Sequence, residues 1–192
     1  GVHGRRDGVT GMQIDQALGD RMVERAVARC AESHFAGDAR RARLALLRGH
    51  CEHCACVSDG LIQQLGEYLG QVGGSVRGVY EFRPEGGPPP DESERRSHRS
   101  AIHLVVWVER KSPALKALAG TLETVLATSR QKLGCPVAEP GCFALDVELV
   151  DDHDVREQRG FGLLVRHPQV HGREVWTPPA APPATEEAPA PA

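Results

Sequence analysis

The segment from His50 to Cys56 has the highest density of metal-ligating side chains in the chain. Its sequence is His-Cys-Glu-His-Cys-Ala-Cys. Cysteine sulfur and histidine nitrogen are the ligands that zinc and other thiophilic metals prefer. If the segment is helical, residues three or four apart share a face, so two or three of these ligands converge. Zinc or another thiophilic metal is therefore a candidate cofactor of this segment, with the candidate ligands Cys51, Cys54, Cys56, His50 and His53.

A structural zinc site needs four ligands, and this segment does not complete one in a known arrangement. A second Cys-x-x-Cys pair is missing from the sequence. Any further ligand has to come from a distant position, and the available side chains are Cys30, His34, Cys135 and Cys142. None of them stands at a spacing that is typical of zinc proteins.

Other interpretations of the same segment stay open. In the favoured one, Cys51 and Cys54 are small buried hydrophobes on a helical seam. That interpretation gives no role to Cys56, His50 and His53. In another, the thiols carry out redox or disulfide chemistry. A zinc deaminase, whose signature begins with His-x-Glu, is not expected because its second half, Pro-Cys-x-x-Cys, is missing from the sequence.

Two groups of charged residues are the remaining candidates for chemistry. Acidic residues and one histidine at 151–154 could bind a hard cation or act as acid and base, but a polar hairpin loop has the same composition and is favoured. The arginines at 40–48 and 95–99 have no interleaved aromatic residues, so solvated surface is expected there. The sequence contains no P-loop and no nucleophile-elbow motif, and therefore no matched catalytic set.

The overall composition excludes several classes of protein. The net charge is −3, so no general basic excess favours nucleic acid as a partner. The longest apolar run, Leu104 to Val108, is far shorter than the ~20 residues of a membrane span. No secretory signal is recognisable, so we expect the six cysteines to be in a reducing compartment and the protein to be cytoplasmic.

Two helical regions are expected in the N-terminal part. Apolar residues recur every four positions from Gln13 to His34, which predicts one helix. From Ala39 to Leu69, alternating three- and four-residue spacing defines a seam that consists of Leu44, Leu47, Cys51, Cys54, Ser58, Leu61, Leu65 and Tyr68. The seam predicts a long second helix, or one broken near Gly60, that folds back on the first helix as a hairpin.

Four strands and one helix are expected after the hairpin. Alternating or continuous apolar patterns predict strands at 76–82, 101–109, 143–149 and 161–166. Ser112 and Pro113 together predict the start of a helix. The expected fold class is α+β, an N-terminal helical hairpin followed by a β-β-α-β-β, mostly antiparallel sheet with one covering helix. In this arrangement the last two strands pair with each other.

The expected domain boundaries follow from these elements. They are a flexible N-terminus at 1–11, the helical hairpin at 12–72, a small sheet region at 73–170 and a disordered tail at 171–192. The hairpin and the sheet region are expected to form one folded unit. The tail is expected because its Pro, Ala, Thr and Glu residues bury too little apolar surface to order the chain.

Two functions are consistent with these observations. The favoured one is a soluble accessory or protein-interaction domain with a Cys/His metal site, which binds a protein partner or a second copy through its N-terminal helices. Neither a membrane nor nucleic acid is expected as a partner. The alternative is a metal- or thiol-dependent redox enzyme that uses the segment from His50 to Cys56. The first is favoured because the sequence lacks a matched catalytic set.

Overall fold

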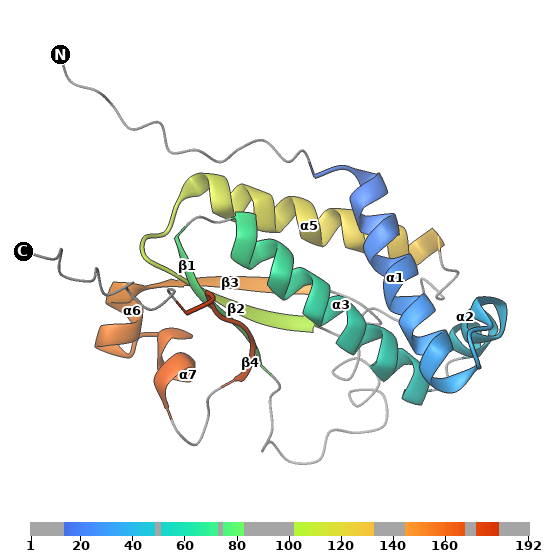
Figure 1. Cartoon of the computed structure of the whole chain (residues 1–192). Helices are drawn as coiled ribbons and strands as arrows, with labels where there is room; N and C mark the ends of the chain where they lie inside the picture. The colour runs from blue at the N-terminus through green and yellow to red at the C-terminus, as the bar shows by residue number, and fades with distance from the viewer. Residues whose placement is uncertain are drawn as a thin grey trace, which may run out of the picture.

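The computed structural model describes residues 14–48, 51–72, 75–82, 102–132, 145–167 and 172–180, and for 51–55 and 130–131 it describes the backbone alone. The elements follow one another in the order α1 (Gln16–His34), α2 (Ala39–Leu47), α3 (Cys51–Val72), β1 (Val76–Glu81), β2 (Ile102–Val108), α5 (Pro113–Lys132), β3 (Leu145–Asp151), α6 (Asp152–Glu157), α7 (Gly162–Arg166) and β4 (Arg173–Trp176) (Figure 1). The structure is therefore a mixed α and β fold, as the sequence predicts. Among the described helices, none is long and apolar enough to cross a membrane.

The four described strands form one mixed sheet in the order β3-β2-β1-β4. β1 runs antiparallel to both β2 and β4, whereas β2 and β3 are parallel. Parallel neighbours need a long crossover, and α5 provides it between β2 and β3. The prediction of a mostly antiparallel sheet is therefore wrong, because β3 pairs with β2 and not with the segment that follows it.

That following segment is helical. The strand predicted at 161–166 is α7 in the structure, and α6 precedes it. Asp151 caps α6, since its side chain accepts a hydrogen bond from the backbone N–H of Asp154 at 2.9 Å. The cap turns the chain into a helix directly after β3, so no hairpin forms there. The fourth strand is instead β4, which lies in the range that the sequence analysis assigned to the tail.

Helices cover the sheet on both faces, where one covering helix was expected. α3 packs on β1 and β4, α5 packs on β3, and α1 lies across α3 and α5 (Figure 1). Consecutive strand residues alternate between faces, so Leu104 and Val106 enter this main core while Val105 points the other way. On that second face Val105 joins Val150 and Val155 in a smaller core beneath α6 and α7.

The second helical region consists of two helices, α2, which ends at Leu47, and α3, which begins at Cys51; it is not one helix broken near Gly60. Gly60 lies inside α3, where a Cβ atom would be 3.2 Å from the Cα of Ala26 in α1. Glycine at this position therefore permits the close approach of α1 and α3.

The division of this region into two helices also disrupts the predicted seam. Its later members Leu61, Leu65 and Tyr68 are buried in α3, as expected. Its first two members, Leu44 and Leu47, are each 45% exposed on α2. A continuous seam assumes one helix with a constant phase, and the interruption after α2 resets that phase. The residues that α2 buries are Ala42, Ala45 and Leu46.

Candidate metal centre

The last turn of α1 places two ligand side chains on one helix face. Cys30 and His34 are four residues apart, and residues at this spacing are neighbours on a helix surface. The helix ends directly after His34, because Gly37 adopts a φ of 85° and its N–H donates to the carbonyl of Ala31 at 3.0 Å. The histidine is therefore at the end of a helix, where its side chain is exposed.

The third ligand side chain comes from α3, which packs antiparallel on α1. Two contacts fix the alignment of the helices. Gln64 donates a hydrogen bond from Nε2 to the carbonyl of Met22 at 2.8 Å, and Gly60 lies against Ala26. From the first pair to the second, the position advances by four residues in α1, from Met22 to Ala26, and goes back by four residues in α3, from Gln64 to Gly60. One further turn along the same face brings Cys56 opposite Cys30.

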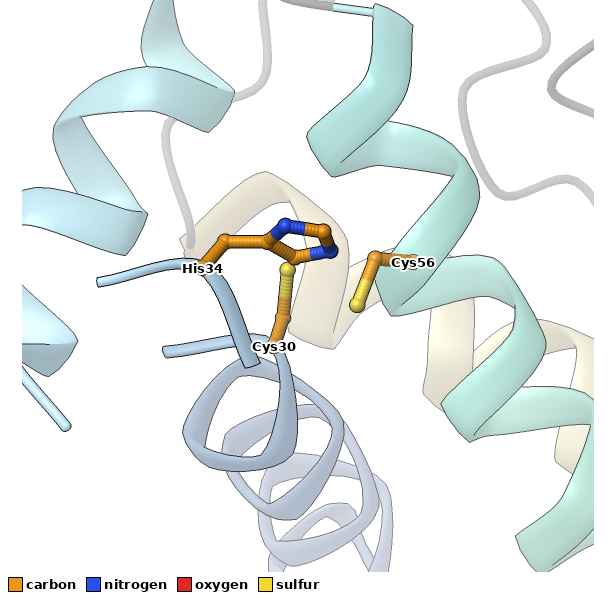
Figure 2. Close-up of side chains that lie close together, drawn as sticks. All are labelled: Cys30, His34 and Cys56. Carbon is orange, nitrogen blue, oxygen red and sulfur yellow. The ribbon is translucent and has the colours of Figure 1, made fainter. Parts of the chain in front are cut away.

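The ligand atoms of Cys30, His34 and Cys56 lie within 4.8 Å of one another. Figure 2 shows both sulfur atoms and the imidazole ring turned toward a common point between α1 and α3. Both cysteines are thiols in the structure. Cys30 is buried, Cys56 is half-buried and His34 is exposed, so the group reaches from the core to the surface.

These distances fit a tetrahedral metal site after a small adjustment. Zinc binds thiolate sulfur at about 2.3 Å and imidazole nitrogen at about 2.0–2.1 Å, so the ligand atoms of one site lie about 3.5–3.8 Å apart. Atoms that already lie within 4.8 Å have to close by at most about 1 Å. Rotations of the cysteine and histidine side chains change such distances without moving a helix.

The structure brings together one of the five predicted ligands and two of the distant side chains. Cys56 belongs to the group, and its partners Cys30 and His34 were among the available further ligands. Cys51, His53 and Cys54 are in α3, but their side chains are not among those described, and His50, Cys135 and Cys142 lie outside the described residues. The four-residue spacing of the α1 pair was a usable signal in the sequence. The third residue of the group, Cys56, could be identified only from the alignment of α1 with α3.

A hydrogen-bond network between α1 and α5 holds α1 in position, and the sequence analysis did not find it. Asp20 accepts hydrogen bonds from Ser129 Oγ at 2.7 Å and Gln16 Nε2 at 3.1 Å, and its carboxylate pairs with Lys132 Nζ at 2.7 Å. The hydrogen bond from Lys132 is the largest cause of the low pKa of Asp20, which falls to about 2. Gly19 adjoins this network and leaves no room for a side chain against Val125.

The acidic group at 151–154 has a different role from either predicted one. It begins α6 and is not a hairpin loop. Arg77 donates to the Asp152 carboxylate from Nε and from Nη2, each at 2.8 Å, and Trp107 donates to it from Nε1 at 2.9 Å. Asp154 pairs with Lys111 Nζ at 2.5 Å. The hydrogen bonds from Arg77 and Lys111 lower the pKa of Asp152 and of Asp154 respectively. Both carboxylates thus have a cationic partner within the protein.

Comparison with known proteins finds no relative of this chain. No family model, no curated protein and no solved structure matches the chain. The function has to be argued from the site alone.

Proposed function

We propose that this chain is an accessory or protein-interaction domain that binds a thiophilic cation, with Zn²⁺ as the first candidate, through Cys30, His34 and Cys56. The observation that supports this most is that three ligand atoms from two helices lie within 4.8 Å of one another. Two of the three side chains are not neighbours of the third in sequence. Their convergence therefore depends on the fold and not on a local cysteine-rich segment.

The ligand types favour zinc over the harder cations. Two sulfurs and one imidazole nitrogen are soft or borderline ligands, which suit Zn²⁺, whereas Ca²⁺ and Mg²⁺ take oxygen ligands. Zinc also needs no redox change and accepts tetrahedral geometry readily. A reducing, cytoplasmic compartment belongs to the same proposal, because it keeps both cysteines available as thiols.

The fourth ligand separates the accessory role from the enzymatic alternative. Structural zinc sites have four protein ligands, whereas catalytic sites have three and a water. We expect the fourth from His50, Cys51, His53 or Cys54, which precede Cys56 directly in the sequence. A closed site would join the end of α1 to the start of α3 and stabilise the helical layer. If none of those four residues contributes, an open position remains and the metal-dependent enzyme gains support.

Metal content of the full chain, purified without an affinity tag, tests the proposal. We expect close to one Zn²⁺ per chain by elemental analysis, because folded structural sites are nearly full. Cys30→Ser and Cys56→Ser should each lower the content strongly. Less than ~0.1 metal per chain after incubation with excess Zn²⁺ and desalting would refute the proposal.

Two control variants make this measurement specific. His103→Ala removes a histidine of β2 that pairs with Asp146 of β3 and belongs to neither α1 nor α3, so it should leave the metal content unchanged. Cys56→His replaces one ligand type by another and should retain part of the metal. Far-ultraviolet circular dichroism of each variant checks that a loss of metal is not a loss of fold.

The N-terminal helices supply the proposed contact with a protein partner or a second copy. On α2 the side chains of Leu44 and Leu47 are three residues apart, so they share one face, and each is 45% exposed. Light scattering after size exclusion tests this part. A monomer at high concentration that also binds no protein from a cell extract would count against it.

A further inference from the structure

The same helix alignment that forms the metal site also places two thiols opposite each other. Cys30 and Cys56 are one turn beyond the contact between Ala26 and Gly60, and their sulfur atoms are within 4.8 Å (Figure 2). The absence of a Cβ atom at Gly60 keeps the two backbones close at the neighbouring turn. Both thiols come from well-formed helices, so neither depends on a loop.

We infer that Cys30 and Cys56 are a redox pair, which a peroxide oxidises to a disulfide between α1 and α3 when the metal is absent. This inference goes beyond the proposed function, because it requires only the two thiols and no bound cation. It differs from the thiol chemistry expected from the sequence, which used cysteines within the segment from His50 to Cys56. The pair identified here joins two helices.

The geometry required is within reach of side-chain rotation and a small helix shift. A disulfide has an S–S bond of about 2.05 Å and a Cβ–Cβ separation of about 3.5–4.5 Å. The sulfur atoms therefore have to approach from a separation of at most 4.8 Å. Helices that meet at glycine and alanine, as at Gly60 and Ala26, approach more closely than helices that meet at larger residues.

The reaction is balanced with hydrogen peroxide as the oxidant. One thiolate attacks a peroxide oxygen, the O–O bond breaks, and the sulfur becomes a sulfenic acid while hydroxide leaves and takes up a proton to form water. The second thiolate then attacks the sulfenic sulfur, the S–S bond forms, and the S–O bond breaks; the hydroxide that leaves takes up the proton released by the second thiol and becomes the second water. Two thiols are oxidised by two electrons in total and one peroxide is reduced to two waters.

Metal binding and disulfide formation exclude each other at this site. A metal ion uses the thiolate lone pairs of Cys30 and Cys56, whereas the disulfide leaves neither sulfur as a thiolate ligand. Bound Zn²⁺ is therefore expected to slow oxidation, and oxidation is expected to release the ion. Oxidation state and metal occupancy would thus report on each other.

The experiment uses the full chain after removal of metal with a chelator, treated with a stoichiometric amount of hydrogen peroxide. Unreacted thiols are then blocked, and tryptic peptides are analysed by mass spectrometry without reduction. Cleavage after arginine releases residues 30–40, which contain Cys30 as their sole cysteine, and residues 49–77, which contain Cys56. We expect these two peptides to be linked.

Variants distinguish Cys56 from the other cysteines of its peptide. In the double variant Cys51→Ser/Cys54→Ser the link should persist, and in Cys56→Ser it should be lost. Loss of the link in the double variant and its persistence in Cys56→Ser would overturn the inference. A link from residues 30–40 to another peptide, or none at all in folded protein, would also overturn it.

Repeating the oxidation with Zn²⁺ present separates this inference from the proposed function. A link that forms in the metal-free chain and is suppressed by Zn²⁺ supports both. A link that forms equally with and without Zn²⁺ supports the redox pair and counts against metal binding at these sulfurs. Failure of the link in the metal-free chain overturns the redox pair, whatever the metal content is.

Discussion

Two groups of chemistry-bearing side chains lie at opposite ends of the fold, one at α6 and one between the end of α1 and the start of α3, and they differ in how they are assembled (Figure 1). The acidic group at 151–154 is continuous in sequence, and its carboxylates at Asp152 and Asp154 are held by Arg77 and Lys111. The sulfur and imidazole group is divided between α1 and α3, and its ligand atoms face one another. The comparison teaches that the density of ligand residues along the chain indicates a metal site less well than the partners that the fold gives to each side chain.

The first prediction concerns stability and the metal. Addition of Zn²⁺ to the metal-free chain should raise its free energy of unfolding by about 2.7 kcal/mol when the free ion is at a hundred times its dissociation constant. Thermal unfolding with and without the ion measures this. Cys56→Ser should remove the increment, whereas Asp152→Asn, in the other group, should keep it. An equal increment in both variants would break the comparison.

The second prediction concerns the helix contact that aligns the site. Gly60→Leu inserts a side chain where even a Cβ atom lies 3.2 Å from the Cα of Ala26, so we expect a loss of about 1–3 kcal/mol from overpacking. Metal affinity should fall as well, because α1 and α3 move apart. Urea denaturation and zinc titration measure the two effects.

The matched control for this change is Gly120→Leu. Gly120 is an exposed glycine inside α5, and a Cβ atom there would meet nothing within 4 Å. This variant should be neutral or more stable by up to about 1 kcal/mol, since leucine is the better helix former. Equal losses in the two variants would contradict the assignment of the loss to the contact between Gly60 and α1.

The third prediction concerns the acidic group. Asp152→Ala leaves the partly buried indole N–H of Trp107 without its acceptor and removes the ion pair with Arg77, which is 46% exposed. We expect a loss of about 1–2 kcal/mol, most of it from the unsatisfied indole, because exposed ion pairs contribute little. Chemical denaturation measures the loss. Unchanged zinc content in this variant would confirm that the two groups are independent.

The fourth prediction concerns the dependence of stability on pH. The pKa of Asp20 falls from 3.8 to about 2 on folding, so its network stabilises the protein above pH 3.8. That contribution is lost as the pH falls from 3.8 through about 2, because the carboxylate becomes protonated in the folded state too. Unfolding of wild type and Asp20→Asn, measured across that window, should show a shallower loss in the variant. Parallel curves would contradict the assignment.

Local pattern was enough to find most of the regular elements. The strand predicted at 101–109 is β2, and the helix predicted to begin at Ser112 and Pro113 is α5, where Ser112 Oγ accepts the N–H of Leu115 at 3.1 Å. Such signals depend on neighbours within one turn or one strand. The prediction of a strand at 161–166 is wrong, because a short apolar run fits a helix as well as a strand and the cap at Asp151 lies outside that window.

For the candidate site, the sequence by itself determined which residue types are available and that Cys30 and His34 share a helix face. It could not determine which residue faces them, because the alignment of two packed helices depends on side-chain volumes at their contact. Here the small residues Ala26 and Gly60 set that alignment, and the tertiary structure thereby decided that Cys56 completes the group. Strand order was decided in the same way, since pairing partners far apart in the chain are selected by the packing of α5 and α3 on the sheet.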